Sequence, residues 1–264
     1  MSITTVGNQL IHYEVLGRGR PLIFIHGWVG SWRYWWPSMQ AMSSRHRSFA
    51  FDLWGFGDSS KATDKYSVAS YVEMIDQFIS QLGISKPVDI VGHSLGAIVG
   101  LAYTNQHPDS VRRLAVVSMP VQGSYIDSRL ATTDPETFAS KFMGKANNFS
   151  EVSAEVRKTD PAAMNQLAAE LRGHNLMNEI ANCPRPFLMV NGAQDSIIQP
   201  PRSEKQYLES MGGNRSIVEL EGSDYFPMLQ EKAKFNRLLL DFTSAADDSQ
   251  GQIAPKEYWQ RRVR

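Results

Sequence analysis

A strand that runs into the sequence Gly-His-Ser-Leu-Gly at 92–96 constrains this chain more than any other stretch. β-branched residues precede the motif at 87–91, and small, helix-compatible residues follow it at 97–106. A serine at the tip of a sharp strand-to-helix turn needs a strained backbone, and the flanking glycines let strand and helix pass closely. The turn directs the Ser94 hydroxyl away from the sheet and puts the Leu95 amide at a helix N-terminus, where it can bind a developing oxyanion. The stretch predicts a nucleophilic serine.

Composition narrows the class of protein. The 264 residues, 42% of them hydrophobic, are enough for one large domain or a domain with an insertion. The 27 basic residues balance the 27 acidic ones, which indicates neither nucleic acid nor an anionic membrane as a partner. The single cysteine, Cys183, excludes an internal disulfide framework. With no secretory pattern at 1–8 and no stretch long enough to span a bilayer, we expect a cytoplasmic protein; the sequence does not indicate its oligomeric state.

Strand patterns alternate with helix patterns along the chain. Near-continuous apolar runs are typical of strands that are buried on both faces of a parallel sheet. Such alternation predicts a mostly parallel, doubly wound α/β sheet with right-handed crossovers. We expect strands at 9–16, 21–26, 49–53, 87–91, 113–118, 186–191 and 216–220, and helices at 32–42, 66–82, 97–106, 202–211 and 228–242.

The alternation stops at Met119-Pro120. Between 121 and 183 no stretch has the pattern of a buried strand, and we expect helices at 136–143, 151–158 and 162–172. We therefore predict a helical cap inserted over the sheet. The expected organisation is a core of 1–120 with 184–243, a cap of 121–183, and a linker with a C-terminal tail at 244–264.

Four motifs in order identify the chain as similar to the α/β-hydrolase superfamily. They are His-Gly-Trp at 26–28, Asp-x-x-Gly-x-Gly-x-Ser at 52–59, Gly-His-Ser-Leu-Gly at 92–96 and Gly-Ala-Gln-Asp at 192–195. The resemblance covers roughly 9–243, and it implies the α/β-hydrolase fold with a cap.

The resemblance also implies roles for individual residues. Ser94 is the expected nucleophile, and the backbone amides of Trp28 and Leu95 are the expected oxyanion hole. Asp195 fits the acid that orients a histidine, whereas the competing acid position after the preceding strand holds Ser118 and offers no carboxylate. No metal and no cofactor are implied. The expected partner is a small, apolar ester or acyl substrate.

The catalytic histidine of that superfamily is missing from its place. Members commonly read Gly-x-x-His-Phe-Pro after the last strand, but this chain reads Gly-Ser-Asp-Tyr-Phe-Pro at 222–227, with Tyr225 at the histidine position. A tyrosine has an ordinary pKa of about 10 against about 6.5 for histidine, so holding phenolate at pH 7 costs on the order of 4 kcal/mol. Negative charge on Asp195 disfavours phenolate further. We expect a neutral Tyr225 that donates its hydroxyl to Asp195 and does not act as a base.

The remaining candidates for the substrate pocket are three histidines and one glycine. His26, Gly27 and His93 belong to the family motifs, where the two histidines are usually structural. His174 belongs to the cap and is the first alternative base. We expect the Ser94 hydroxyl to face a pocket that residues 121–183 roof.

Three functions stay open at this point. The first is a serine hydrolase of small carboxylic esters, impaired by Tyr225. The second is a catalytically silent protein that binds small ligands. The third is carbon–carbon bond hydrolysis, lyase or acyl-transfer chemistry on the same scaffold, which needs the same histidine. Epoxide hydrolysis and dehalogenation are disfavoured, because those enzymes use an aspartate where Ser94 stands.

Overall fold

The computed structural model describes residues 2–144, 148–210 and 215–245. Its centre is an eight-stranded sheet with the strand order β1-β2-β4-β3-β5-β6-β7-β8. The first two strands pair antiparallel, as do β2 and β4, and every other neighbouring pair is parallel. The strands are β1 (Ser2–Val6), β2 (Gln9–Gly17), β3 (Arg20–Ile25), β4 (His46–Phe51), β5 (Val88–His93), β6 (Val111–Val117), β7 (Phe187–Gly192) and β8 (Arg215–Leu220).

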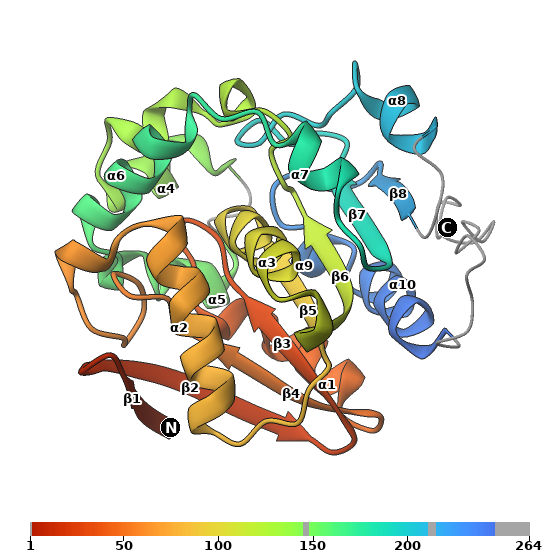
Figure 1. The fold of residues 1–264 in the computed structure, drawn as a ribbon. Helices are drawn as coiled ribbons and strands as arrows, with labels where there is room; N and C mark the ends of the chain where they lie inside the picture. Colours follow the sequence, from red (N-terminus) through yellow and green to blue (C-terminus); the bar gives the residue numbers. More distant parts are fainter. Residues whose placement is uncertain (1, 145–147, 211–214, 246–264) are drawn as a thin grey trace.

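Helices cover both faces of this sheet (Figure 1). One layer contains α2 and α3, which contact each other, and the other contains α1, α9 and α10. The α-helices are α1 (Trp36–Met42), α2 (Val68–Gln81), α3 (Leu95–Gln106), α4 (Pro135–Phe142), α5 (Ser150–Ser153), α6 (Pro161–Leu171), α7 (Met177–Ala181), α8 (Lys205–Ser210), α9 (Pro227–Gln230) and α10 (Lys232–Ser244). Short 3-10 helices are η1 (Trp32–Trp35), η2 (Thr63–Lys65), η3 (Pro108–Ser110), η4 (Gly123–Tyr125), η5 (Ser128–Ala131) and η7 (Val156–Lys158).

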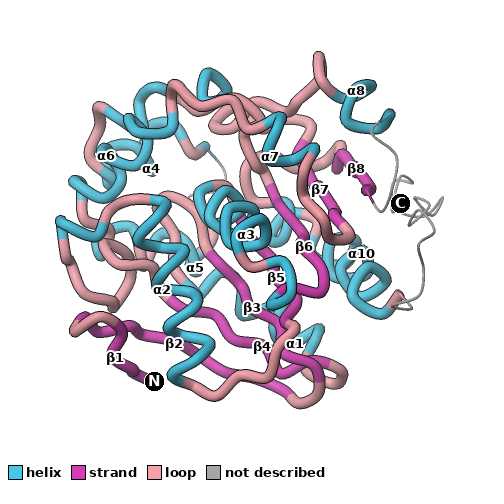
Figure 2. Tube along the Cα trace, in the orientation of Figure 1, coloured by secondary structure: helices cyan, strands magenta, loops and turns pink. Residues whose placement is uncertain are grey.

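In the described part of the segment between β6 and β7, the regular elements are helices, and its residues also take part in two isolated β-bridges. Figure 2 shows it as helices joined by loops, with α4 and α6 together at one end of the molecule. Aspartates start two of these helices, because Asp134 and Asp160 accept hydrogen bonds from backbone amides in the first turn. The predicted fold class is confirmed. The division into core, cap and tail stays a prediction, and 246–264 lie outside the described residues.

The parallel strands bring the motif loops together at one edge of the sheet. β3, β5, β6, β7 and β8 all point their carboxyl ends to this edge, and the loops after them carry the candidate residues. In open α/β sheets this edge is where ligands bind. Among the described residues, no helix combines the length and the apolar character that crossing a bilayer requires.

Candidate active site at the carboxyl edge of the sheet

Ser94 occupies the turn between β5 and α3 in a strained conformation. Its φ is +53° and its ψ is −110°, a region that residues with a side chain rarely adopt. The close packing behind the turn explains the motif's second glycine: a Cβ on Gly96 would lie 2.4 Å from the carbonyl oxygen of His26. The Ser94 amide also donates to the Val117 carbonyl of β6 at 2.8 Å, which anchors the turn to the sheet. The sequence pattern thus produces a rigid strand-to-helix elbow.

The loop after β3 lies directly against this serine. A Cβ added to Gly27 would be 2.8 Å from the Ser94 Cβ, so only glycine lets the loop approach this closely. The loop continues through Trp28 to Val29, whose φ of +55° is an outlier for a β-branched residue. Leu95 is the first residue of α3. Among the described backbone hydrogen bonds outside regular helices and strands, none has the Trp28 or the Leu95 amide as its donor.

Asp195 lies after β7 in a buried site where only one of its oxygens is paired. Oδ1 accepts the backbone amides of Ile197 and Ile198, each at 2.9 Å. Oδ2 is buried and has no hydrogen-bond partner among the described residues. Burial raises the pKa of Asp195 to about 7, against the lowering effect of the two amides and of Ser118, and the charge of Asp224 raises it further.

Tyr225 fills the histidine position with its hydroxyl toward Ser94. The side chain is 2% exposed. Burial raises the pKa of Tyr225 well above its ordinary value, the nearby Ser94 hydroxyl lowers it, and the charge of Asp195 raises it again. The Ser94 and Tyr225 hydroxyls do not meet the geometry of a hydrogen bond. The phenol therefore stays protonated at any working pH.

The expected hydrogen bond from Tyr225 to Asp195 is not formed. An imidazole has two ring nitrogens, one for the serine and one for the acid. A phenol has a single polar atom, and a tyrosine that directs it to Ser94 has no second donor for Asp195. This geometry explains why Asp195 Oδ2 is left unpaired.

Two of the other candidate histidines hold the backbone in place. His26 bonds the Gly27 carbonyl through Nδ1 at 2.9 Å, and its Nε2 accepts the Leu53 amide at 2.9 Å. His93 bonds the Tyr34 hydroxyl through Nδ1 at 2.9 Å and the Tyr225 carbonyl through Nε2 at 2.7 Å. With both nitrogens engaged, neither imidazole is available as a base for Ser94.

The structure does not bring His174 to Ser94. His174 is exposed and lines a small, mainly apolar groove with residues of α2, α3 and the cap, and Ser94 is not among the lining residues. The assignment of His174 to the substrate pocket stays a prediction. The His174 carbonyl accepts the Gly123 amide at 2.7 Å.

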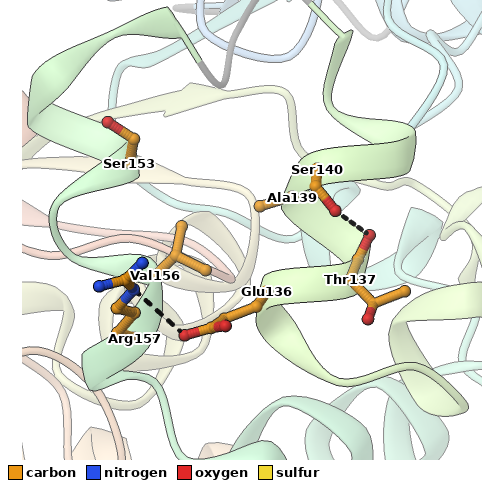
Figure 3. A pocket seen from close by; sticks show the side chains of 7 residues that line it. All are labelled: Glu136, Thr137, Ala139, Ser140, Ser153, Val156 and Arg157. Atoms are coloured by element: carbon orange, nitrogen blue, oxygen red, sulfur yellow. Dashed lines mark hydrogen bonds and ion pairs between the residues drawn. The ribbon is translucent and has the colours of Figure 1, made fainter.

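Ser94 is closed off rather than facing an open pocket. The serine has no exposed surface, and neither does Trp28. One cavity of about 270 Å³ is lined by Asp195, Tyr125 and Gln199. A cavity of about 640 Å³ is bounded by Trp32, Trp36 and residues between 150 and 158. Another of about 420 Å³ lies within the cap between α4 and the α5–η7 segment (Figure 3). The expected pocket at Ser94 with a roof formed by residues 121–183 stays a prediction.

Sequence reasoning missed Tyr34 and Ser118. Tyr34 bonds both Gly27 and His93, and Ser118, with a φ of +45°, lies beside the Tyr225 carbonyl at 3.4 Å. Tyr34 stood among five tryptophans, at 28, 32, 35, 36 and 54, near the expected oxyanion loop, and this cluster was the available signal. Ser118 carried no local signal, because its role depends on contacts with distant loops.

A family model described as alpha/beta hydrolase fold matches residues 20–155, just over half of the chain. The chain belongs to the alpha/beta hydrolase family. A solved structure of a hydrolase from Pseudomonas aeruginosa superimposes with a TM-score of 0.80 at 20% identity, covering 92% of this chain and 98% of that one. At this identity the likeness shows the fold.

Two curated relatives match a part of this alpha/beta hydrolase. A probable lysophospholipase, BODYGUARD 3 of Arabidopsis thaliana, is 38% identical over 104 residues, which are 38% of this chain and 21% of that protein. A soluble epoxide hydrolase of a Corynebacterium strain is 32% identical over 114 residues, which are 43% of this chain and 40% of that protein. The matched segments span less than half of either relative, and both relatives are hydrolases by name.

Proposed function

We propose that this alpha/beta hydrolase is a serine hydrolase of small carboxylic esters or related acyl compounds, with turnover impaired by Tyr225. Ser94 is the proposed nucleophile, the amides of Trp28 and Leu95 form the oxyanion hole, and Asp195 is the acid. One observation carries the proposal: Ser94 stands on a strained elbow, with the Gly27 loop against its Cβ. This is the geometry in which a tetrahedral intermediate meets two backbone donors.

The proposed reaction begins with attack of the Ser94 hydroxyl on the ester carbonyl. The carbonyl oxygen becomes an oxyanion between the two amides, and the Ser94 proton must leave and later reach the departing alkoxide. Tyr225 is the polar group beside Ser94, and its raised pKa keeps it neutral. A neutral phenol donates a proton but accepts none, so acylation in the unmodified protein is slow.

A catalytically silent binding protein is the second candidate. The observation that favours it is the closed nucleophile, because Ser94 has no exposed surface and Asp195 Oδ2 is unpaired. Carbon–carbon bond hydrolysis, lyase and acyl-transfer chemistry need the same missing base and share the deficit of the first candidate.

Labelling with a fluorophosphonate separates the two candidates. This probe reacts with a serine that an oxyanion hole supports, so we expect slow labelling of the native protein at Ser94 and none of Ser94→Ala. Hydrolysis of short activated esters, measured in parallel, is expected to be slow and to vanish in the same variant. Absence of both labelling and turnover at protein concentrations high enough to see one event per hour supports the silent binding protein instead.

A further inference from the structure

The Tyr34 hydroxyl lies at the centre of a chain of buried hydrogen bonds. It accepts the Gly27 amide at 2.6 Å and bonds Nδ1 of His93 at 2.9 Å. Nε2 of His93 then bonds the Tyr225 carbonyl at 2.7 Å. A carbonyl only accepts, which assigns the proton to Nε2 and makes Nδ1 the acceptor of the Tyr34 O–H. All three hydrogen bonds in this series therefore donate in the same direction, from the Gly27 N–H to the Tyr225 C=O.

This series of hydrogen bonds connects three segments that are far apart in sequence. Gly27 belongs to the loop after β3, His93 ends β5 immediately before Ser94, and Tyr225 lies in the loop after β8. Ring packing reinforces the connection, since the Tyr34 and His93 rings meet edge to face at 5.5 Å, and His93 lies 4.5 Å from the Tyr225 ring. Tyr34 and His93 have no exposed surface.

Burial also keeps the imidazole neutral. It lowers the pKa of His93 to about 3, and the nearby His26 lowers it as well, whereas the hydrogen bond to Tyr225 raises it. One protonated and one unprotonated ring nitrogen therefore persist at every pH at which the protein is folded and working. The hydrogen bonds of His93 therefore hold the neighbouring loops at fixed distances, and a change of pH in this range does not break them.

We propose that Tyr34 and His93 are positioning residues for the Ser94 site, setting the Trp28 amide on one side of the nucleophile and residue 225 on the other. The inference rests on the proposed function, because it assigns the two loops a task in acyl transfer. Small displacements of a donor or a base from the reacting atoms are costly to rate. Loss of the Tyr34 hydroxyl frees both loops at once, although neither Tyr34 nor His93 touches the substrate.

The first test is spectroscopic and needs no turnover. Nitrogen-15 spectra of protein labelled at histidine should give, for the native chain, one protonated and one unprotonated His93 nitrogen across the pH range. In Tyr34→Phe we expect the Nδ1 signal of His93 to shift, because Nδ1 loses its donor while Nε2–H still donates to the Tyr225 carbonyl. We also expect the Gly27 amide to exchange with solvent about fivefold faster, because it loses its acceptor. The matched control is Tyr71→Phe, which removes another buried hydroxyl, bonded to the Trp54 carbonyl at 2.7 Å, and should change neither signal.

The second test is kinetic, in the Tyr225→His background. Tyr34→Phe should lower kcat for a short activated ester at least tenfold and leave KM within about threefold, as expected for donors displaced from the transition state. His93→Gln, which keeps a donor and an acceptor, should retain more activity than His93→Phe, and Tyr71→Phe should match its parent. Melting temperatures measured in parallel show whether each variant is folded.

The outcomes of the two tests distinguish a failure of this inference from a failure of the proposed function. If Tyr34→Phe leaves the His93 signals and the Gly27 exchange rate unchanged, the connection does not hold the loops and the inference is wrong. If these signals change but kcat does not, the loops are held without any effect on the reaction, and the inference is again wrong. If Tyr225→His has no activity at all, the proposed function fails, and the exchange of the Gly27 amide still decides whether Tyr34 positions its loop.

Discussion

Asp195 and Tyr225 share a buried site without a hydrogen bond between them. Asp195 Oδ2 and the Tyr225 hydroxyl each lack a partner among the described residues, and the charge of Asp195 raises the pKa of the phenol. A buried polar atom without a partner costs about 1–3 kcal/mol. Under the proposed function, the site has a nucleophile and an acid but no base between them, and replacing Tyr225 by histidine tests this interpretation.

Tyr225→His should restore turnover. An imidazole at this position offers Nδ1–H to the unpaired Oδ2 of Asp195 and Nε2 to the Ser94 hydroxyl, and it is smaller than the phenol it replaces. We expect kcat/KM for short activated esters to rise by about 10²–10⁴-fold, the usual contribution of positioned acid–base catalysis. Initial rates with an activated acetate ester measure the effect.

Two controls accompany this variant. Tyr225→Phe removes the hydroxyl without adding a base and should show no rise, and Ser94→Ala should abolish the gain in the Tyr225→His background. Ordinary enzyme rates in the native protein, unchanged in Tyr225→Phe, would mean that another group removes the Ser94 proton.

The raised pKa of Asp195 predicts a loss of stability with rising pH. Its pKa is about 7 in the folded protein and near the ordinary 3.8 in the unfolded chain. Between these values the folded state holds a proton that the unfolded chain releases, so ionisation favours unfolding. The protonated Asp195 carboxyl stabilises the folded state fully below about pH 4. This stabilisation declines as the pH rises to about 7 and is absent above that.

Asp195→Asn should remove this part of the pH dependence. An amide keeps an acceptor for the Ile197 and Ile198 amides and carries no charge, so at pH 8 we expect the variant to be more stable than the native protein by on the order of 1–3 kcal/mol. Urea unfolding from pH 4 to pH 8 measures it, with the exposed Asp64→Asn as the matched control that changes little. A native profile that is flat over this range, or a variant that is less stable at pH 8, contradicts the assignment.

Local sequence pattern predicted the parts of the site that backbone chemistry dictates. The apolar runs and glycines gave the parallel strands, the order of the motifs and the elbow at Ser94, because each depends on neighbours in sequence. Several elements were not predicted, because they depend on contacts with distant parts of the chain. The helix α7 (Met177–Ala181) was not expected, and the helix predicted at 151–158 is divided into α5 and η7. β1 (Ser2–Val6) is a half-exposed edge strand that forms only by pairing with β2, and the predicted last helix is divided at Glu231 into α9 and α10.

The contacts around Ser94 are different in kind. The hydrogen bonds of His93 join it to Tyr34 and Tyr225, which are 59 and 132 positions away in sequence. The burial of Ser94 and the unpaired oxygen of Asp195 likewise depend on distant parts of the sequence. Such contacts depend on how strands line up across the sheet, and no local pattern encodes them. His174 illustrates the limit, since its place in the cap sequence said nothing of which side of α3 its loop covers.

Packing behind the elbow predicts a strong effect of a single methyl group. In Gly96→Ala the new Cβ would lie 2.4 Å from two backbone oxygens, those of Ile25 and His26. Backbone cannot move aside cheaply, and overpacking of this kind costs about 1–3 kcal/mol or more. Gly173→Ala is the matched control, because no atom lies within 4 Å of its added Cβ. Thermal unfolding should show a clear loss for the first and little change for the second; equal melting temperatures would refute the close approach of α3 to the β3 loop.

A buried carboxylate ties the helical segment between β6 and β7 to η1. Glu155 is 1% exposed, and its Oε1 accepts Nε of Arg33 in η1 at 2.8 Å and lies 3.3 Å from Nζ of Lys158. Removing one partner of a buried pair costs about 3–5 kcal/mol, but the Arg33 side chain is 39% exposed and Lys158 remains, so we expect Arg33→Met to cost about 1–2 kcal/mol.

The cap also offers the matched control for this ion pair. Arg157 pairs with Glu136 at 3.3 Å across the cavity in Figure 3, and both side chains are largely exposed. Arg157→Met should therefore change the free energy of unfolding by less than about 0.5 kcal/mol. Because Arg33→Met and Glu155→Gln each remove the same interaction, the double variant should be less destabilised than the sum of the two single variants. Strictly additive free energies in urea unfolding would show that the two side chains do not interact.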